Sequence, residues 1–165
     1  MKVTILGSGA IGGLAGSHMT RTGYDVVLVD QWKAHVDAMN AKGLYIDGIR
    51  GEMTIPVKAL TPDQLPEHVE KNGPLEAVLI ATKSQHTEGA LRQILPLISP
   101  ETFIVSFQNG FNEPVIAKVL NEAGLGGMER VVGSIPNYGG ALVDPGYLEF
   151  VHEGPIQLGE MSTSE

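Results

Sequence analysis

The chain contains no cysteine among its 165 residues, and this absence excludes several kinds of chemistry. Without thiols there is no disulfide framework, no thiol nucleophile and no zinc site built on cysteine. Histidine is the other common zinc ligand, but the five histidines are scattered without the spacing of a metal site. We therefore expect no bound metal, and we expect these side chains at the surface or in capping roles. The histidines are His18, His35, His68, His86 and His152.

Basic residues and long apolar runs are also scarce. The chain has 11 Lys and Arg against 19 Asp and Glu, a net charge of −8. We therefore expect no recognition of nucleic acid or anionic membrane through a basic surface, because no cluster could neutralise their phosphates. The apolar runs around Leu28 and Leu79 span about five residues, whereas a bilayer requires about 20. We expect a cytoplasmic protein whose length suits one domain with a sizeable core.

Glycine is abundant, and its arrangement near the amino terminus is the most informative feature. An apolar run at residues 3–6 breaks into Gly-x-Gly-x-x-Gly and then into a helical pattern. Gly7 permits a tight turn, Gly9 lacks the Cβ that would block a diphosphate, and Gly12 allows close packing of helix and strand. Unpaired N–H groups at the helix start face the anion. A turn without a ligand uses the same glycines. The predicted cofactor-binding turn comprises Gly7, Ser8, Gly9, Ala10, Ile11 and Gly12.

Asp30 follows the second apolar run, about 20 residues after the glycine pattern, where a ribose diol would lie. Its carboxylate can accept hydrogen bonds from the 2′ and 3′ hydroxyls of adenosine ribose, but it would repel the 2′-phosphate of NADP. The next residues offer only Lys33 to neutralise a phosphate. The position therefore favours NADH over NADPH. The alternative is that Asp30 caps the following helix.

Short apolar runs alternate with helical patterns along the chain. Continuous apolar runs are typical of strands covered on both faces. We expect an α/β fold of the Rossmann type, with a doubly wound, mostly parallel sheet, helices on both faces and closing antiparallel strands. Strands are predicted at 3–6, 26–29, 77–81, 103–105 and 131–132, helices at 10–21, 33–42, 87–95 and 113–123, a hairpin within 43–56, and an antiparallel pair at 147–151 and 156–158. Residues 1–160 form the dinucleotide-binding domain, and 161–165 begin a linker.

Polar side chains follow two further predicted strands. Lys83 comes after the run at 77–81, and Asn109 comes after the run at 103–105. Ligands of open α/β sheets bind beyond the carboxyl ends of the strands. There Lys83 could offer a charge to the cofactor, and Asn109 could bond the nicotinamide ribose or a substrate carbonyl. The alternatives are a solvated loop and a simple Asn-Gly turn. The glycine cluster at 133–140 would either approach the nicotinamide or form a tight crossover loop.

Taken together, these residues resemble the amino-terminal half of the ketopantoate reductases, also called 2-dehydropantoate 2-reductases. Residues 5–12 match the opening of the family, and residues 82–84, 108–110 and 154–160 match its lysine, its Asn-Gly turn and its closing strands. The resemblance implies NAD(P)H-dependent reduction of ketopantoate to pantoate, a step towards coenzyme A. It implies that residues 7–12 hold the diphosphate. It also implies that Lys83 reaches the adenosine side, that Asn109 lies by nicotinamide and substrate, and that a backbone group near Gly139 contacts the nicotinamide.

Two departures from the family pattern affect these expectations. Members that prefer NADPH usually carry an arginine after the second strand, where this chain has Asp30 and Gln31. The catalytic lysine and substrate-binding acid of the family lie in a helical carboxyl-terminal domain, so no catalytic residue is expected in this chain. A reductase of another 2-oxo acid or an opine-type substrate, and an NAD-sensing regulatory module, are the alternatives. The expected partners are a small 2-oxo acid and, in a homodimer, a second copy of the chain.

Overall fold

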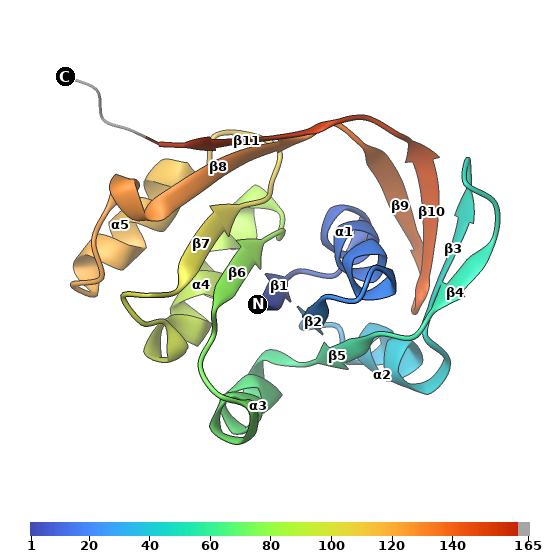
Figure 1. The fold of residues 1–165 in the computed structure, drawn as a ribbon, viewed down its shortest axis with the longest axis horizontal. Coiled ribbons are helices and arrows are strands. Elements are labelled where there is room, and N and C mark those ends of the chain that lie inside the picture. Colours follow the sequence, from blue (N-terminus) through green and yellow to red (C-terminus); the bar gives the residue numbers. More distant parts are fainter. Residues whose placement is uncertain (162–165) are drawn as a thin grey trace.

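A computed structural model describes residues 1–161, which fold around a seven-stranded sheet (Figure 1). Its strand order is β11-β8-β7-β6-β1-β2-β5, and only β11 runs antiparallel to its neighbour. The chain order changes direction between β1 and β6, so a crevice is expected beyond their carboxyl ends. The strands are β1 (Lys2–Leu6), β2 (Asp25–Val29), β5 (Lys58–Leu60), β6 (Ala77–Ile80), β7 (Phe103–Ser106), β8 (Val131–Pro136) and β11 (Ile156–Glu160).

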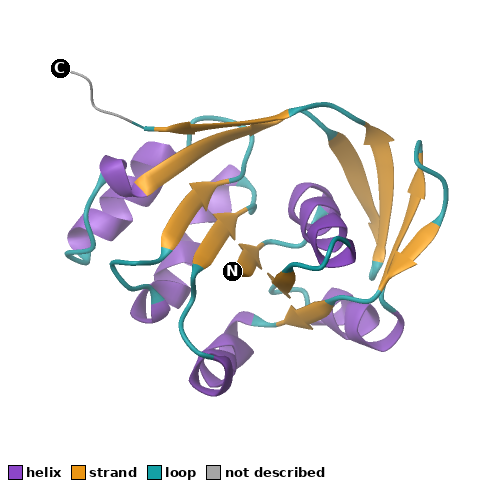
Figure 2. Cartoon of the chain, viewed as in Figure 1, coloured by secondary structure: helices purple, strands orange, loops and turns teal. Residues whose placement is uncertain are grey.

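Helices pack on both faces of this sheet (Figure 2). On one face, Leu14 of α1 packs among Ile5 and Leu28, and on the other, Leu91 of α4 packs with Ile80 and related core residues. The α/β expectation is therefore confirmed. The α-helices are α1 (Ala10–Arg21), α2 (Lys33–Lys42), α3 (Leu65–Asn72), α4 (Thr87–Ile94) and α5 (Glu113–Glu122), and short 3-10 helices are η1 (Pro62–Gln64), η2 (Ser84–His86), η3 (Leu95–Leu97) and η4 (Met128–Arg130).

A second sheet of four strands lies against the outer side of α1 (Figure 1). Its order is β4-β3-β10-β9, with β4 (Met53–Ile55), β3 (Leu44–Gly48), β10 (Tyr147–His152) and β9 (Gly139–Asp144). Helix α1 is therefore enclosed between two sheets, and its glycines make this possible. A Cβ at Gly13 would come within 2.7 Å of Leu148, and one at Gly16 within 2.5 Å of Leu28.

The closing strands are paired differently from the prediction. The hairpin within 43–56 is confirmed as β3 and β4, but residues 147–151 do not pair with 156–158. Instead β10 joins β9 and β3, while β11 joins β8. In this part of the sequence the chain passes from one sheet to the other twice, from β8 to β9 and from β10 to β11, and the two crossings are held together where Asn137 N–H donates to the Pro155 carbonyl at 3.0 Å. The predicted linker at 161–165 lies outside the described residues except for Met161.

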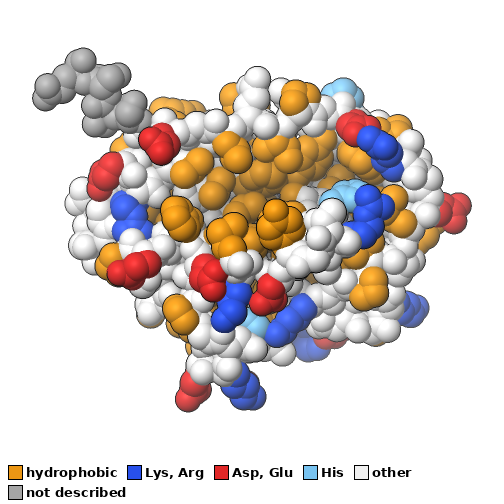
Figure 3. All heavy atoms as spheres, viewed as in Figure 1, with side chains coloured by type: hydrophobic (Ala, Val, Ile, Leu, Met, Phe, Trp, Pro, Cys, Tyr) orange, Lys and Arg blue, Asp and Glu red, His pale blue; other side chains and the backbone are white. Residues whose placement is uncertain are grey.

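One face of the main sheet is hollowed and apolar (Figure 3). On the α1 side of β6, β7, β8 and β11, the described part of the chain places no helix, and a cavity of about 950 Å³ opens there. Phe103 and Leu158 are 63% and 65% exposed on this face. Within residues 1–161, none of the helices has the length and hydropathy needed to cross a membrane.

Candidate functional site

In the turn between β1 and α1, the three glycines of the motif differ in what surrounds the position of a Cβ atom. Gly7 has a φ of +93°, and a Cβ there would come within 2.9 Å of the Ala81 carbonyl oxygen. A Cβ at Gly12 would overlap the Gly7 carbonyl oxygen. A Cβ at Gly9, by contrast, would meet no atom within 4 Å. Gly7 and Gly12 are thus required by the fold, whereas Gly9 faces open space at the start of α1, as a diphosphate site demands.

A groove of about 450 Å³ lies beyond the carboxyl ends of β1, β2 and β6. It brings together four residues predicted from separate parts of the sequence: Gly7, Gly9, Asp30 and Lys83. Ser8 is fully buried behind the turn, and Gly12 packs inside the fold. The remaining lining residues are Leu6, Val29, Gln31, Pro62, Ala81, Thr82, Gln85, His86, Gly89, Ala90, Gln93 and Ile94.

The Asp30 carboxylate borders the groove and also holds the glycine turn. Its Oδ2 accepts hydrogen bonds from Ser8 N–H at 2.9 Å and from Ser8 Oγ at 3.0 Å, and its Oδ1 accepts one from Trp32 N–H at 2.9 Å. The N-cap of α2 is Trp32, so Asp30 is not the residue that caps this helix. A carboxylate has about four acceptor positions, so Asp30 retains capacity for a further donor.

His35 lies directly behind the glycine turn, a position that sequence reasoning did not single out. The expectation that histidines lie at the surface or cap helices is wrong for His35, which is fully buried and is not the N-cap of α2. Its Nε2 lies 3.0 Å from the Ser8 carbonyl oxygen, and its Nδ1 accepts from Gly146 N–H at 2.9 Å. These partners lie 27 and 111 residues away in the sequence, so no local spacing could have revealed the contact.

The loop that carries Lys83 is held from the neighbouring strand end. The buried Gln108 donates from Nε2 to the Thr82 carbonyl at 2.5 Å and to Thr87 Oγ1 at 2.7 Å. The next residue, Asn109, is exposed, and its carbonyl accepts from Asn112 Nδ2 at 2.9 Å. Asn109 therefore lies beside this loop but does not line the groove.

Gly139 lies at the start of β9 in the second sheet, where it pairs with His152. It is not among the residues that line the groove. The glycine cluster at 133–140 is not one loop, because it contributes most of β8 and the beginning of β9. The backbone near Gly139 is thus set by strand pairing, and its contact with a nicotinamide stays a prediction.

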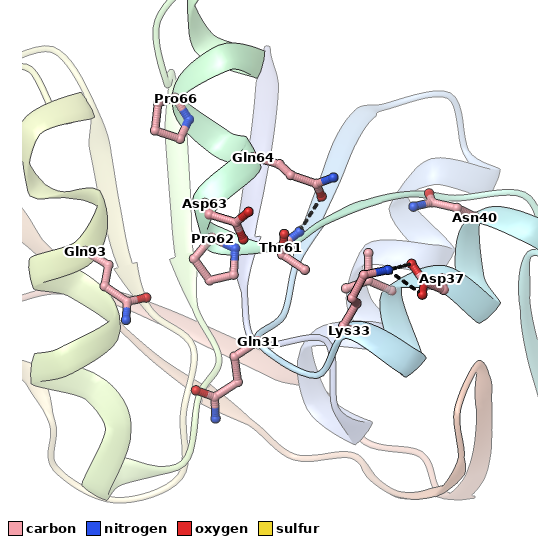
Figure 4. Close-up of a pocket in the computed structure, with 11 residues that line it drawn as sticks. Gln31, Lys33, Asp37, Asn40, Thr61, Pro62, Asp63, Gln64, Pro66 and Gln93 are labelled. Atoms are coloured by element: carbon pink, nitrogen blue, oxygen red, sulfur yellow. Dashed lines mark hydrogen bonds and ion pairs between the residues drawn. The ribbon is translucent and has the colours of Figure 1, made fainter.

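A cavity of about 690 Å³, lined mostly by residues with polar side chains, continues the groove past Asp30 (Figure 4). The two share Gln31, Pro62 and Gln93. Lys33 also lines the cavity, but its ammonium group is paired with the Asp37 carboxylate at 2.6 Å (Figure 4). The cation nearest to Asp30 in sequence is thereby partly neutralised, although both members of the pair are exposed and the pair is weak.

The parallel sheet, the glycine turn and a groove at the point where the strand order reverses define a Rossmann-type NAD(P)-binding domain. A model of the family described as "Ketopantoate reductase PanE/ApbA" matches residues 3–163. The chain belongs to this family of oxidoreductases, as its amino-terminal NAD(P)-binding domain.

Individual relatives agree with this assignment. A 2-dehydropantoate 2-reductase of Pyrococcus horikoshii is 34% identical over 162 residues, which cover 96% of this chain and 47% of the relative. The crystal structure of 2-dehydropantoate 2-reductase from Geobacter metallireducens matches with a TM-score of 0.82 at 28% identity, covering all of this chain and 51% of that one. A D-mandelate dehydrogenase with NADH and anilino(oxo)acetate has the same fold, with a TM-score of 0.82 at 23% identity. The chain thus spans about half the length of these proteins.

Proposed function

We propose that this domain binds NADH in the groove between Gly9, Asp30 and Lys83. The diphosphate would lie against Gly9 at the start of α1, the adenosine ribose at Asp30, and the adenine towards the polar cavity at Gln31. The observation that carries the proposal is the open space beyond the Gly9 Cβ position, in a turn where the other two motif glycines are enclosed by the fold. A helix start with free space in front of it is a favourable anion site.

The reaction we propose for the complete enzyme is the reduction of ketopantoate to pantoate. When bound, the reduced nicotinamide would supply the hydride for the ketone carbon, and the ketone oxygen would need a proton from a donor outside the residues assigned in this chain. The residues of this chain bind and orient the cofactor, with Asn109 beside the nicotinamide and the substrate. The similarity to the Pyrococcus 2-dehydropantoate 2-reductase supports this substrate over another 2-oxo acid. Membership of a reductase family favours an enzyme over an NAD-sensing module.

The preference for NADH follows from the charges around Asp30. A 2′-phosphate at the ribose would lie beside the Asp30 carboxylate, and Lys33 is already paired with Asp37. Two like charges about 4 Å apart repel by a few kcal/mol at an effective dielectric constant near 20. Lys83, on the far side of the groove, is the cation that would offset part of this repulsion.

Titration calorimetry of the 165-residue chain with each cofactor tests the proposal. We expect NADH to bind at least about tenfold more tightly than NADPH, a difference of about 1.4 kcal/mol. In Asp30→Asn the side-chain oxygen can still accept from Ser8, but the charge is gone, so the two affinities should converge. Equal affinities in the wild-type chain, or tighter binding of NADPH, would contradict the placement of the ribose at Asp30. If neither NADH nor NADPH binds, the assignment of the groove as a cofactor site is contradicted.

A further inference from the structure

The histidine behind the glycine turn is enclosed by three parts of the fold. His35 lies in the first turn of α2 and has no exposed surface. Its ring contacts Ser8 of the cofactor turn and Gly146 of the β9–β10 turn, and it stacks on Trp32 with ring centroids 5.8 Å apart. A fully buried imidazole with both nitrogens engaged is held in one orientation.

The hydrogen bonds determine which nitrogen carries the proton. Gly146 N–H is a donor, so Nδ1 of His35 must be the unprotonated acceptor. The proton then lies on Nε2, which donates to the Ser8 carbonyl oxygen. A carbonyl oxygen offers no proton, so the opposite tautomer would lose both bonds. Gly146 is itself fixed, because its carbonyl accepts from Tyr45 N–H and a Cβ there would come within 2.9 Å of Ala38.

The Ser8 carbonyl belongs to the peptide group whose N–H is that of Gly9. In a planar trans peptide the C=O and N–H bonds point in opposite directions. With the carbonyl directed at His35, the Gly9 N–H is directed away from the buried ring, and Gly9 lines the groove. Asp30 fixes the preceding peptide through Ser8 N–H. The two peptide groups that flank Ser8 are thus each held by one residue of the segment that follows β2.

We propose that His35 is a positioning residue of the cofactor site, which in its Nε2–H form clamps the Ser8–Gly9 peptide and presents the Gly9 amide to the diphosphate. The clamp ties the turn to the second sheet through Gly146, so the turn is ordered before the ligand arrives. This inference rests on the proposed function for its effect on NADH binding. Its structural part, the tautomer and the peptide orientation, is independent of any ligand.

Two substitutions separate the two bonds of the ring. The amide nitrogen of His35→Gln can replace Nε2 and keep the bond to Ser8, whereas the shorter amide of His35→Asn can replace only Nδ1 and keep the bond to Gly146. We expect the Kd for NADH to rise at least about tenfold in His35→Asn and to stay within about threefold in His35→Gln. His152→Asn, at an exposed histidine outside the groove, is the matched control and should bind as the wild type does.

Calorimetry measures the Kd for NADH, and urea unfolding measures the free energy of unfolding of each variant. ¹⁵N NMR of the wild-type chain identifies which nitrogen of the His35 ring carries the proton. Unchanged NADH affinity in folded His35→Asn, or affinity losses that merely follow the loss of stability in both variants, would overturn the proposal. An Nδ1–H tautomer in the wild-type spectrum would overturn it as well, even if a variant fails to fold. If the wild-type chain binds no NADH but shows the Nε2–H tautomer, the proposed function fails while the clamp on Ser8 stands.

Discussion

At the scale of single residues, the motif glycines differ in what surrounds their missing side chains. We expect Gly9→Val to remain folded, with the free energy of unfolding lowered by about 1 kcal/mol or less, since its Cβ meets open space. NADH affinity should fall at least tenfold because the side chain fills the diphosphate position. Gly12→Ala should instead destabilise the chain by about 1–3 kcal/mol or more, since its Cβ overlaps the Gly7 carbonyl. Urea unfolding and calorimetry on the same samples distinguish these outcomes, and retained affinity in folded Gly9→Val would contradict the site.

A second prediction at this scale concerns pH. The pKa of His18 is lowered by burial first and then by the positive charges of Arg21 and Arg50, while Glu153 acts in the opposite direction. The folded state therefore binds this proton less readily than the unfolded chain, whose histidine titrates near 6.5. The stability that depends on neutral His18 is complete above that pH and is lost as pH falls towards the folded pKa. The free energy of unfolding should decrease between about pH 7 and 5, and His18→Gln should flatten this decrease. An unchanged slope in the variant would contradict the assignment.

How far the sequence reveals the site depends on whether a residue acts through local geometry. Gly7, Gly9 and Asp30 were predictable because a turn and a strand end fix their positions within one βαβ unit, and the structure brings them to one groove with Lys83. Asp30 also accepts a hydrogen bond from Ser8 N–H, and this contact was not predictable from the sequence spacing. His35 could not be found at all, because its role arises from contacts between segments that only the tertiary fold brings together.

At the scale of elements, the same distinction separates strand positions from strand pairing. The parallel strands were predictable because each is a continuous apolar run, as burial on both faces requires. The pairing of β10 with β9 and β3, and of β11 with β8, was not, because the runs at 147–151 and 156–158 fit a hairpin equally well. The chain crosses between the sheets near Asn137 and again near Pro155. These crossings place residues 147–151 in the four-stranded sheet and residues 156–158 in the main sheet.

Helix α4 shows which element contacts stabilise the fold. Leu91 is fully buried against the sheet, whereas Arg92 on the same helix makes exposed ion pairs with Glu88 and with Glu122 of α5. Leu91→Ala should lower the free energy of unfolding by about 2–5 kcal/mol, since it leaves a cavity. Arg92→Ala should lower it by about 1 kcal/mol or less, since exposed pairs contribute little. Urea unfolding measures both, and similar losses in the two variants would show that the ion pairs of Arg92 are stronger than their exposure indicates.

At the scale of the whole molecule, the main sheet is covered unevenly. Parallel strands are normally buried on both faces, yet Val105 in β7 and Leu79 in β6 are only half-buried on the hollowed face (Figure 3). The relatives reported above are about twice as long as this chain. Residues of the described domain line the groove between Gly9, Asp30 and Lys83, so we expect cofactor binding to be separable from turnover.

The last prediction follows from that separation. We expect the 165-residue chain to bind NADH but to oxidise it with ketopantoate far more slowly than about 1 s⁻¹, a low value for an enzyme. A positioned proton donor contributes about 10²- to 10⁴-fold. Among the described residues that line the groove, the side chains with an ammonium or imidazole group are Lys83 and His86, which lie within residues 83–86 on the adenosine side of the proposed cofactor position. Absorbance at 340 nm with ketopantoate measures turnover, and Lys83→Ala and His86→Gln serve as controls. Turnover near 1 s⁻¹ that Lys83→Ala abolishes while the Kd for NADH stays unchanged would assign the proton donor to this domain and contradict the cofactor role of Lys83.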